Sequence, residues 1–249
     1  MRSRFLPEGR LLHTPENEAA CASRDGLRRA MEEETVLEGV AQLCDGAHNL
    51  LVSVGPFTGF LPREEAALGI AEGTTREIAI LSRVGKPVCF QITALEESEG
   101  VLRPRLSRRR AQQAALDAML AGLHPGCILP AVVTHLESFG AFVDIGCGVP
   151  SLIGIENISV SRIPHPDQRF RVGQAIFAVV QELDPKLGRV YLTHRELLGT
   201  WAENAARFQA GMTVPGIVRG LKEYGAFVEL TPNLSGLAER KKHRVRRRR

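Results

Sequence analysis

The feature that most constrains this chain is a short phrase that occurs twice, 85 residues apart. Each copy has an aromatic residue, then Gly-Ala-Phe-Val and an acid: Phe139-Gly140-Ala141-Phe142-Val143-Asp144 and Tyr224-Gly225-Ala226-Phe227-Val228-Glu229. Residues three apart in a regular strand point to opposite faces. A bulge at the glycine would bring both rings onto one face, where flat nucleobases can stack. Alternatively, both rings are buried in the core. The recurrence of the whole phrase favours a position on the surface instead.

The repeat extends well beyond this phrase. Residues 211–239 align without a gap with residues 126–154. The identical residues are Gly211, Pro215, Val218, Leu221, Gly225, Ala226, Phe227, Val228 and Leu237. Earlier residues align loosely, with His48 near the Phe139 position and Leu51 near the Phe142 position. The sequence therefore predicts three copies of one unit, the third of which ends after its third strand.

The central copy indicates the fold. Between Gly126 and Arg195, five strand candidates fall within about 70 residues, with a long irregular segment before the fourth. The turn at 184–188 starts with Asp-Pro and ends with Gly, which is typical of a β-turn. Short strands with one long crossover predict a small closed barrel of the oligonucleotide-binding (OB) type.

The whole chain is predicted to be mainly β, with tandem five-stranded OB-fold barrels joined by α-helical linkers. Ser107 is an N-cap candidate for one linker, and a stripe from Leu197 through Trp201 to Phe208 predicts the other, with Trp201 packed between modules. The predicted parts are a helical leader (1–34), a degenerate module (35–106), a helical linker (107–124), the central module (125–195), a second helical linker (196–210), an incomplete third module (211–240) and a basic tail (241–249).

The net charge of +4 belongs to the tail. Residues 241–249 carry seven positive charges, which leaves residues 1–240 with 25 basic and 28 acidic side chains. Such a run often contacts polyanions, and an aberrant gene end is its alternative origin. Five arginines near the start of the first linker, at 103, 105, 108, 109 and 110, indicate either a phosphate contact or a solvated helix face.

Several classes of protein are not indicated. No apolar run approaches the roughly 20 residues of a membrane span, and the N-terminus has no apolar signal region, so we expect a cytoplasmic protein. Five scattered cysteines without C-x-x-C spacing predict neither disulfides nor a zinc site. No catalytic motif is found, so we expect no enzyme, no metal and no cofactor. We interpret His124, His135, His165 and His194 as surface or structural residues.

The central unit resembles the S1 RNA-binding domain, an OB-fold module repeated in the largest protein of the bacterial small ribosomal subunit. The residues that carry the resemblance are Phe139 to Gly146, Leu152-Ile153, Arg171 to Gln174, Asp184-Pro185 and Arg189 to Thr193. Members of this family bind single-stranded RNA with two aromatics, a His, an Asp and an Arg. The resemblance thus implies RNA-binding roles for Phe139, Phe142, Asp184 and Arg189, and for Tyr224 and Phe227 in the third copy. The family's His is replaced by Gly154, by Pro62 near its position in the first copy and by Glu239 in the third.

The resemblance implies a translation protein that binds single-stranded RNA or mRNA, associates with the small ribosomal subunit and is a monomer. A protein-interaction or regulatory scaffold with weak or lost RNA binding is the alternative. This alternative is based on two features: the missing His, and a central module whose six basic and six acidic residues give it no net charge.

Overall fold

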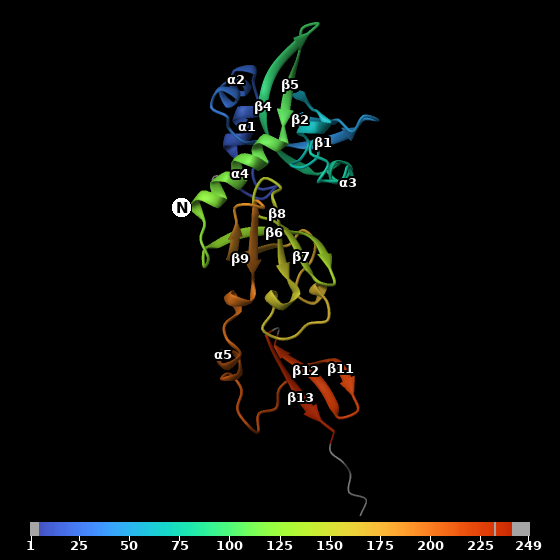
Figure 1. Ribbon diagram of the computed structural model, residues 1–249, viewed down its shortest axis with the longest axis vertical. Coiled ribbons are helices and arrows are strands. Elements are labelled where there is room, and N and C mark those ends of the chain that lie inside the picture. Colours follow the sequence, from blue (N-terminus) through green and yellow to red (C-terminus); the bar gives the residue numbers. More distant parts are fainter. Residues whose placement is uncertain (1–4, 232, 241–249) are drawn as a thin grey trace, which may run out of the picture.

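The computed structural model describes residues 5–231 and 233–240, so the predicted basic tail lies outside the described residues. The described residues form two closed five-stranded barrels and a three-stranded sheet. These three units follow one another along the long axis of the molecule (Figure 1). The predicted fold class, mainly β with tandem OB-type barrels, is confirmed. In these two described ranges, no helix is long and apolar enough to cross a membrane.

The first barrel carries the N-terminal helices on its side. Helices α1 (Pro15–Cys21) and α2 (Arg24–Glu32) begin at the N-caps Thr14 and Ser23 and contact β1 and β4. The barrel closes in the order β1-β2-β3-β5-β4 around a hydrophobic core. Its elements are β1 (Leu37–Cys44), β2 (Leu50–Val54), β3 (Phe57–Leu61), η1 (Arg63–Glu65), α3 (Ile78–Leu81), β4 (Pro87–Ser98) and β5 (Val101–Ser107).

The central barrel has the same topology. It closes in the order β10-β8-β7-β6-β9, so its first strand pairs with its second and fourth, as in the first barrel. The linker helix α4 (Arg108–Gly122) begins at Ser107 as predicted, and Ala111, Ala115 and Met119 join the core of the central barrel. The barrel's elements are β6 (Ile128–Glu137), β7 (Gly140–Asp144), β8 (Pro150–Gly154), η2 (Ile155–Asn157), η3 (Pro166–Gln168), β9 (Ala175–Asp184) and β10 (Arg189–Thr193).

The segment before α1 joins the two barrels. The buried Glu8 carboxylate accepts hydrogen bonds from the Arg108 Nε of α4 at 2.6 Å and from Arg83 of the first barrel at 3.2 Å. The Glu8 backbone N–H donates to the Asp144 carboxylate of the central barrel at 2.7 Å. Burial alone raises the pKa of Glu8, but Arg108 and Arg83 more than offset this, and the pKa lies below its ordinary value. A buried cluster of charged side chains around Glu8 therefore connects the two barrels.

The basic start of α4 is not a free phosphate-binding surface. Arg108 is buried in the cluster around Glu8. Arg109 pairs with Glu65 at 2.8 Å, and Arg105 with Glu96 at 3.5 Å. The structure thus uses much of this positive charge within the first barrel and at its junction.

The helix predicted over 196–210 is wrong in extent. The 3-10 turn η4 (Arg195–Leu198) stops at Gly199, which has φ +75°, and α5 (Trp201–Ala205) begins only after it. Thr200 and Glu203 form a capping box, which starts a new helix. Trp201 is 60% exposed, so its predicted packing between modules is also wrong. The apolar stripe was misleading because the cap residues divide it.

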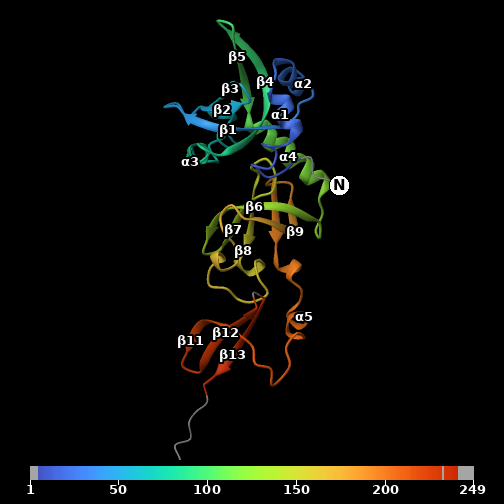
Figure 2. The ribbon, with the colours of Figure 1, turned by 180° about the vertical axis from the view of Figure 1, so that it is seen from behind.

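The third copy forms the sheet β11-β12-β13 beside α5, at the end of the molecule away from the first barrel, as the views from both sides show (Figures 1 and 2). Its strands are β11 (Ile217–Lys222), β12 (Gly225–Thr231) and β13 (Leu234–Glu239). Buried Glu229 ties the sheet to the central barrel: it accepts from Arg219 of β11 at 2.8 Å and from Arg169 of the barrel's crossover at 3.2 Å. Burial raises the pKa of Glu229, but the two arginines reverse this and lower it.

Candidate nucleic-acid interface

Phe139 and Phe142 lie together on the outer surface of the central barrel. Their ring centroids are 6.0 Å apart and the rings meet edge to face at 88°. Phe139 is 53% exposed, and Phe142 is partly buried beside it. The rings lie outside the barrel core, so the alternative reading of two core aromatics is wrong.

The rings come together for a different reason from the one predicted. Phe139 lies in the turn before β7, and β7 pairs regularly with β8 along its length, so the predicted bulge at Gly140 is wrong. The bulge is in the neighbouring strand β6, between Val133 and His135. Glycine is required at 140 because a Cβ there would collide with the Ile153 carbonyl of β8.

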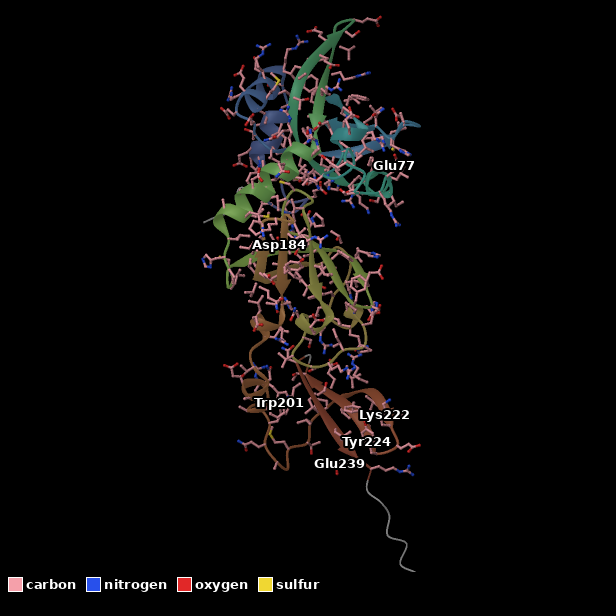
Figure 3. All side chains as sticks on the ribbon, viewed as in Figure 1. Glu77, Asp184, Trp201, Lys222, Tyr224 and Glu239 are labelled. Carbon is pink, nitrogen blue, oxygen red and sulfur yellow. The ribbon has the colours of Figure 1, made fainter. Side chains whose placement is uncertain are left out.

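The third sheet repeats this arrangement. The Tyr224 and Phe227 rings are 6.3 Å apart at 87°, and both are exposed. The bulge recurs in β11 between Val218 and Gly220, 85 residues after that in β6. Figure 3 places Tyr224 close to Lys222 and Glu239 on this sheet. Two edge-to-face ring pairs with nearly the same geometry therefore stand on two modules.

The other two residues implied by the resemblance lie apart from the ring pair. Asp184 accepts hydrogen bonds from the backbone of Lys186 and Leu187, both at 3.0 Å, and so shapes the β9–β10 turn. Arg189 is exposed and pairs in register with Asp184 at the start of β10. Since β10 runs parallel to β8, both lie at the start of β8, whereas Phe139 adjoins its end.

A row of outward side chains connects these strands. His135 of β6 lies opposite Phe142 of β7, Phe142 opposite Leu152 of β8, and Leu152 opposite Tyr191 of β10. The sequence interpretation missed Tyr191 and treated His135 as an ordinary surface residue. Tyr191 was accessible to sequence reasoning, because it follows Arg189 by two residues in a strand and so shares its face.

The first barrel has different side chains in the same row. Leu43, Leu51 and Phe60 occupy the places of His135, Phe142 and Leu152, and the bulge in β1 again lies just before Leu43. The first barrel therefore presents two aliphatic side chains where the central barrel presents rings. This substitution contributes to the loose alignment of the first copy, despite its identical topology.

In the first barrel, an ion-pair cluster occupies the position that aligns with Phe139 of the central barrel. His48 Nδ1 contacts one oxygen of Glu77 at 2.6 Å, and Arg63 Nε donates to the other at 2.8 Å. The hydrogen bond from Arg63 is the main cause that lowers the pKa of Glu77. Figure 3 shows Glu77 on the side of the first barrel near α3. The position aligned with Phe139 thus serves a polar contact with the crossover.

Behind the ring pair, the last residue of β7 is electrostatically unusual. The buried Asp144 carboxylate accepts from the backbone of Glu8, and from Gly146 and Gly148 at 2.8 and 3.0 Å. Burial, together with the nearby Glu8 charge, raises the pKa of Asp144 to about 7. Asp144 therefore anchors the ring-bearing strand to the junction between the barrels.

Two closed barrels of this strand order, with one ring pair at the second strand of the central module, define a tandem OB-fold protein. Residues 123–195, which form the central barrel, match the family described as the S1 RNA binding domain. The segment that forms the central barrel is therefore similar to the S1 RNA binding domain, as the resemblance in its sequence indicated.

Curated relatives match most of the chain. It is 29% identical over 218 residues to the small ribosomal subunit protein bS1 of Neisseria meningitidis, which covers 85% of this chain and 37% of that protein. It is 32% identical over 194 residues to the protein of that name from Leuconostoc lactis, covering 76% of this chain and 43% of that protein. The chain thus spans less than half the length of these relatives.

Among solved structures, a multidomain protein with nucleic acid binding domains from Streptococcus pneumoniae is 18% identical. The match covers 83% of this chain and 62% of that chain, with a TM-score of 0.22.

Proposed function

We propose that this chain binds single-stranded RNA, with Phe139 and Phe142 of the central barrel as the main stacking surface. The observation that carries the proposal is the exposed edge-to-face ring pair within the segment that matches the S1 RNA binding domain. Each base stacked on an aromatic ring contributes about 1–3 kcal/mol. Two rings therefore supply enough free energy for weak binding by one module.

The third sheet gives the same chain a second contact. Tyr224 and Phe227 reproduce the geometry of the first pair and are exposed. A strand of RNA long enough to reach both pairs gains affinity from the high effective concentration of the second site. Arg189, exposed on β10, adds a positive charge to the same barrel at a distance from the ring pair, while Asp184 acts by shaping the turn before it.

The test is fluorescence anisotropy of labelled single-stranded RNA with the full chain. Phe139→Ala with Phe142→Ala should weaken binding by tenfold or more, since about 1.4 kcal/mol corresponds to tenfold. Phe177→Ala is the matched control, because Phe177 is a 62% exposed phenylalanine on β9 of the same barrel. Equal affinities for the wild type, the double variant and the control would reject the proposal.

We further propose that this RNA is mRNA and that the protein acts in translation on the small ribosomal subunit. The support is the similarity to relatives named as small ribosomal subunit proteins. Cosedimentation of the full chain with purified small subunits tests this step. If the chain binds RNA but stays in the supernatant, the RNA-binding proposal stands and the ribosomal one fails.

A further inference from the structure

The bulge in β6 determines which side chain lies beside Phe142. The pairing skips one residue there, so Val133 pairs with Val143 and His135, rather than Thr134, lies opposite Phe142. Val133 is buried in the barrel core, and His135 is exposed on the outer face. A bulge of this kind re-aims side chains at a strand's surface.

At this position the central module alone has a ring. The residue opposite the equivalent of Phe142 is Leu43 in the first barrel and Gly220 in the third sheet. The His135 ring lies 6.4 Å from the Phe142 ring, and the two planes are inclined by only 31°. Both rings thus present their faces in similar directions, unlike the perpendicular Phe139.

The other flank of the ring pair is unfavourable for a nucleotide. Gly154, opposite Gly140 at the end of β8, has no side chain to stack on. The Glu156 carboxylate lies 2.5 Å from the point where a Cβ at Gly154 would stand. A carboxylate lies on each flank, Glu156 on the β8 side and Glu137 on the β6 side. The two flanks therefore differ in the ring: the β6 side has His135, whereas the β8 side has Gly154.

We infer that His135 is a third stacking ring, and that single-stranded RNA passes from Phe139 over Phe142 towards β6 instead of β8. This inference rests on the proposed function. Glu137 holds the imidazole through a contact of 2.8 Å between its Oε1 and Nε2, with both side chains largely exposed. An exposed pair of this kind is weak, so it orients the ring without preventing it from adjusting to a base.

The experiment is anisotropy of labelled oligouridylate with the full chain and four variants. His135→Ala should weaken binding about tenfold, as expected for one lost stacking contact. His135→Tyr should restore binding to within about threefold of the wild type, because any ring of this size stacks. His124→Ala, which changes an exposed histidine at the end of the α4 linker, should have no effect. Phe142→Ala reports separately on the proposed function.

The outcomes are distinguishable. If Phe142→Ala weakens binding while His135→Ala does not, RNA binding stands and the third ring is rejected. If His135→Ala and His135→Tyr weaken binding equally, the contact is not stacking and the inference is also rejected. If the wild type does not bind, or Phe142→Ala has no effect, the proposed function fails and this inference fails with it. Circular dichroism of each variant shows that the barrel remains folded.

Discussion

The two closed barrels have one topology and two different surfaces. Across the equivalent row, the first barrel presents Leu43 and Leu51, and the central barrel presents His135 and Phe142. At the position aligned with Phe139, the first barrel has His48, which is bound to Glu77. Both barrels keep the bulge in their first strand and bury the inward residues of their strands in a hydrophobic core. The fold is therefore maintained by the inward residues, while the outward ones decide whether a flat ligand can stack.

This difference gives the two barrels separate roles. The first barrel, with its N-terminal helices and its share of the Glu8 cluster, supports the junction. The central barrel, with the third sheet beyond it, carries the exposed rings.

The largest expected effect comes from the junction. Glu8→Ala leaves Arg108 buried without its partner, and breaking a buried pair in this way costs about 3–5 kcal/mol. We expect a corresponding fall in the free energy of unfolding in urea, with both barrels affected. Glu33→Ala, at an exposed glutamate after α2, is the control. A change below about 1 kcal/mol for Glu8→Ala would show that the barrels do not depend on this cluster.

The second largest effect is expected from exchanging outward side chains between the two barrels. His135→Leu with Phe142→Leu gives the central barrel the two leucines that the first barrel has at these positions, and RNA affinity should fall at least tenfold. The reciprocal change, Leu43→His with Leu51→Phe in the first barrel, should not increase RNA affinity. At the position aligned with Phe139 the first barrel still has His48, which remains paired with Glu77. Anisotropy measures both. A gain from the reciprocal change would mean that the first barrel is a latent RNA site.

The Asp144 carboxyl should make stability depend on pH. It ionises near pH 4 in the unfolded chain and at about pH 7 in the folded protein, so between these values the folded state holds the extra proton. The free energy of unfolding should therefore fall as pH rises from 5 to 7, by more than about 1 kcal/mol. The opposite contribution of Glu8, whose pKa is lowered, acts below this window. Asp144→Asn should flatten the fall, and an unchanged slope would contradict this assignment.

The smallest effect is expected from the ion-pair cluster of the first barrel. Glu77→Gln removes the charge that pairs with His48 and Arg63, and these side chains are substantially exposed. Exposed ion pairs contribute little to stability, so the midpoint of urea unfolding should barely change, and RNA affinity should not change. A loss of RNA affinity would place this cluster in the binding surface.

Much of the fold could be predicted from the sequence because its signals are local and repeated. The recurrence at 85 residues located the ring-bearing strands, and Ser107 located the start of α4. The linker after the central barrel could not be predicted from its apolar stripe, because Gly199 and Thr200 end one helical turn and begin another.

The arrangement of the outward side chains could not be fully predicted from the sequence, because it depends on strand pairing and on contacts between distant residues. The bulge that positions His135 is a feature of strand pairing and leaves no mark in the order of residues, so the phrase suggested Gly140 instead. Arg108 looked like part of a basic surface because its partner, Glu8, lies 100 residues away in the chain. Phe139 and Phe142 were found from the sequence because the repeat identifies both rings together.

The most direct test of the account is ultraviolet cross-linking of the full chain to single-stranded RNA, with the cross-linked residues located by mass spectrometry. The account predicts cross-links in 135–154 of the central barrel, weaker ones in 220–239 of the third sheet, and none in 43–63 of the first barrel. Cross-links concentrated in 43–63, or distributed evenly over both barrels, would contradict the claim that the outward row of the central barrel distinguishes it as the RNA-binding module.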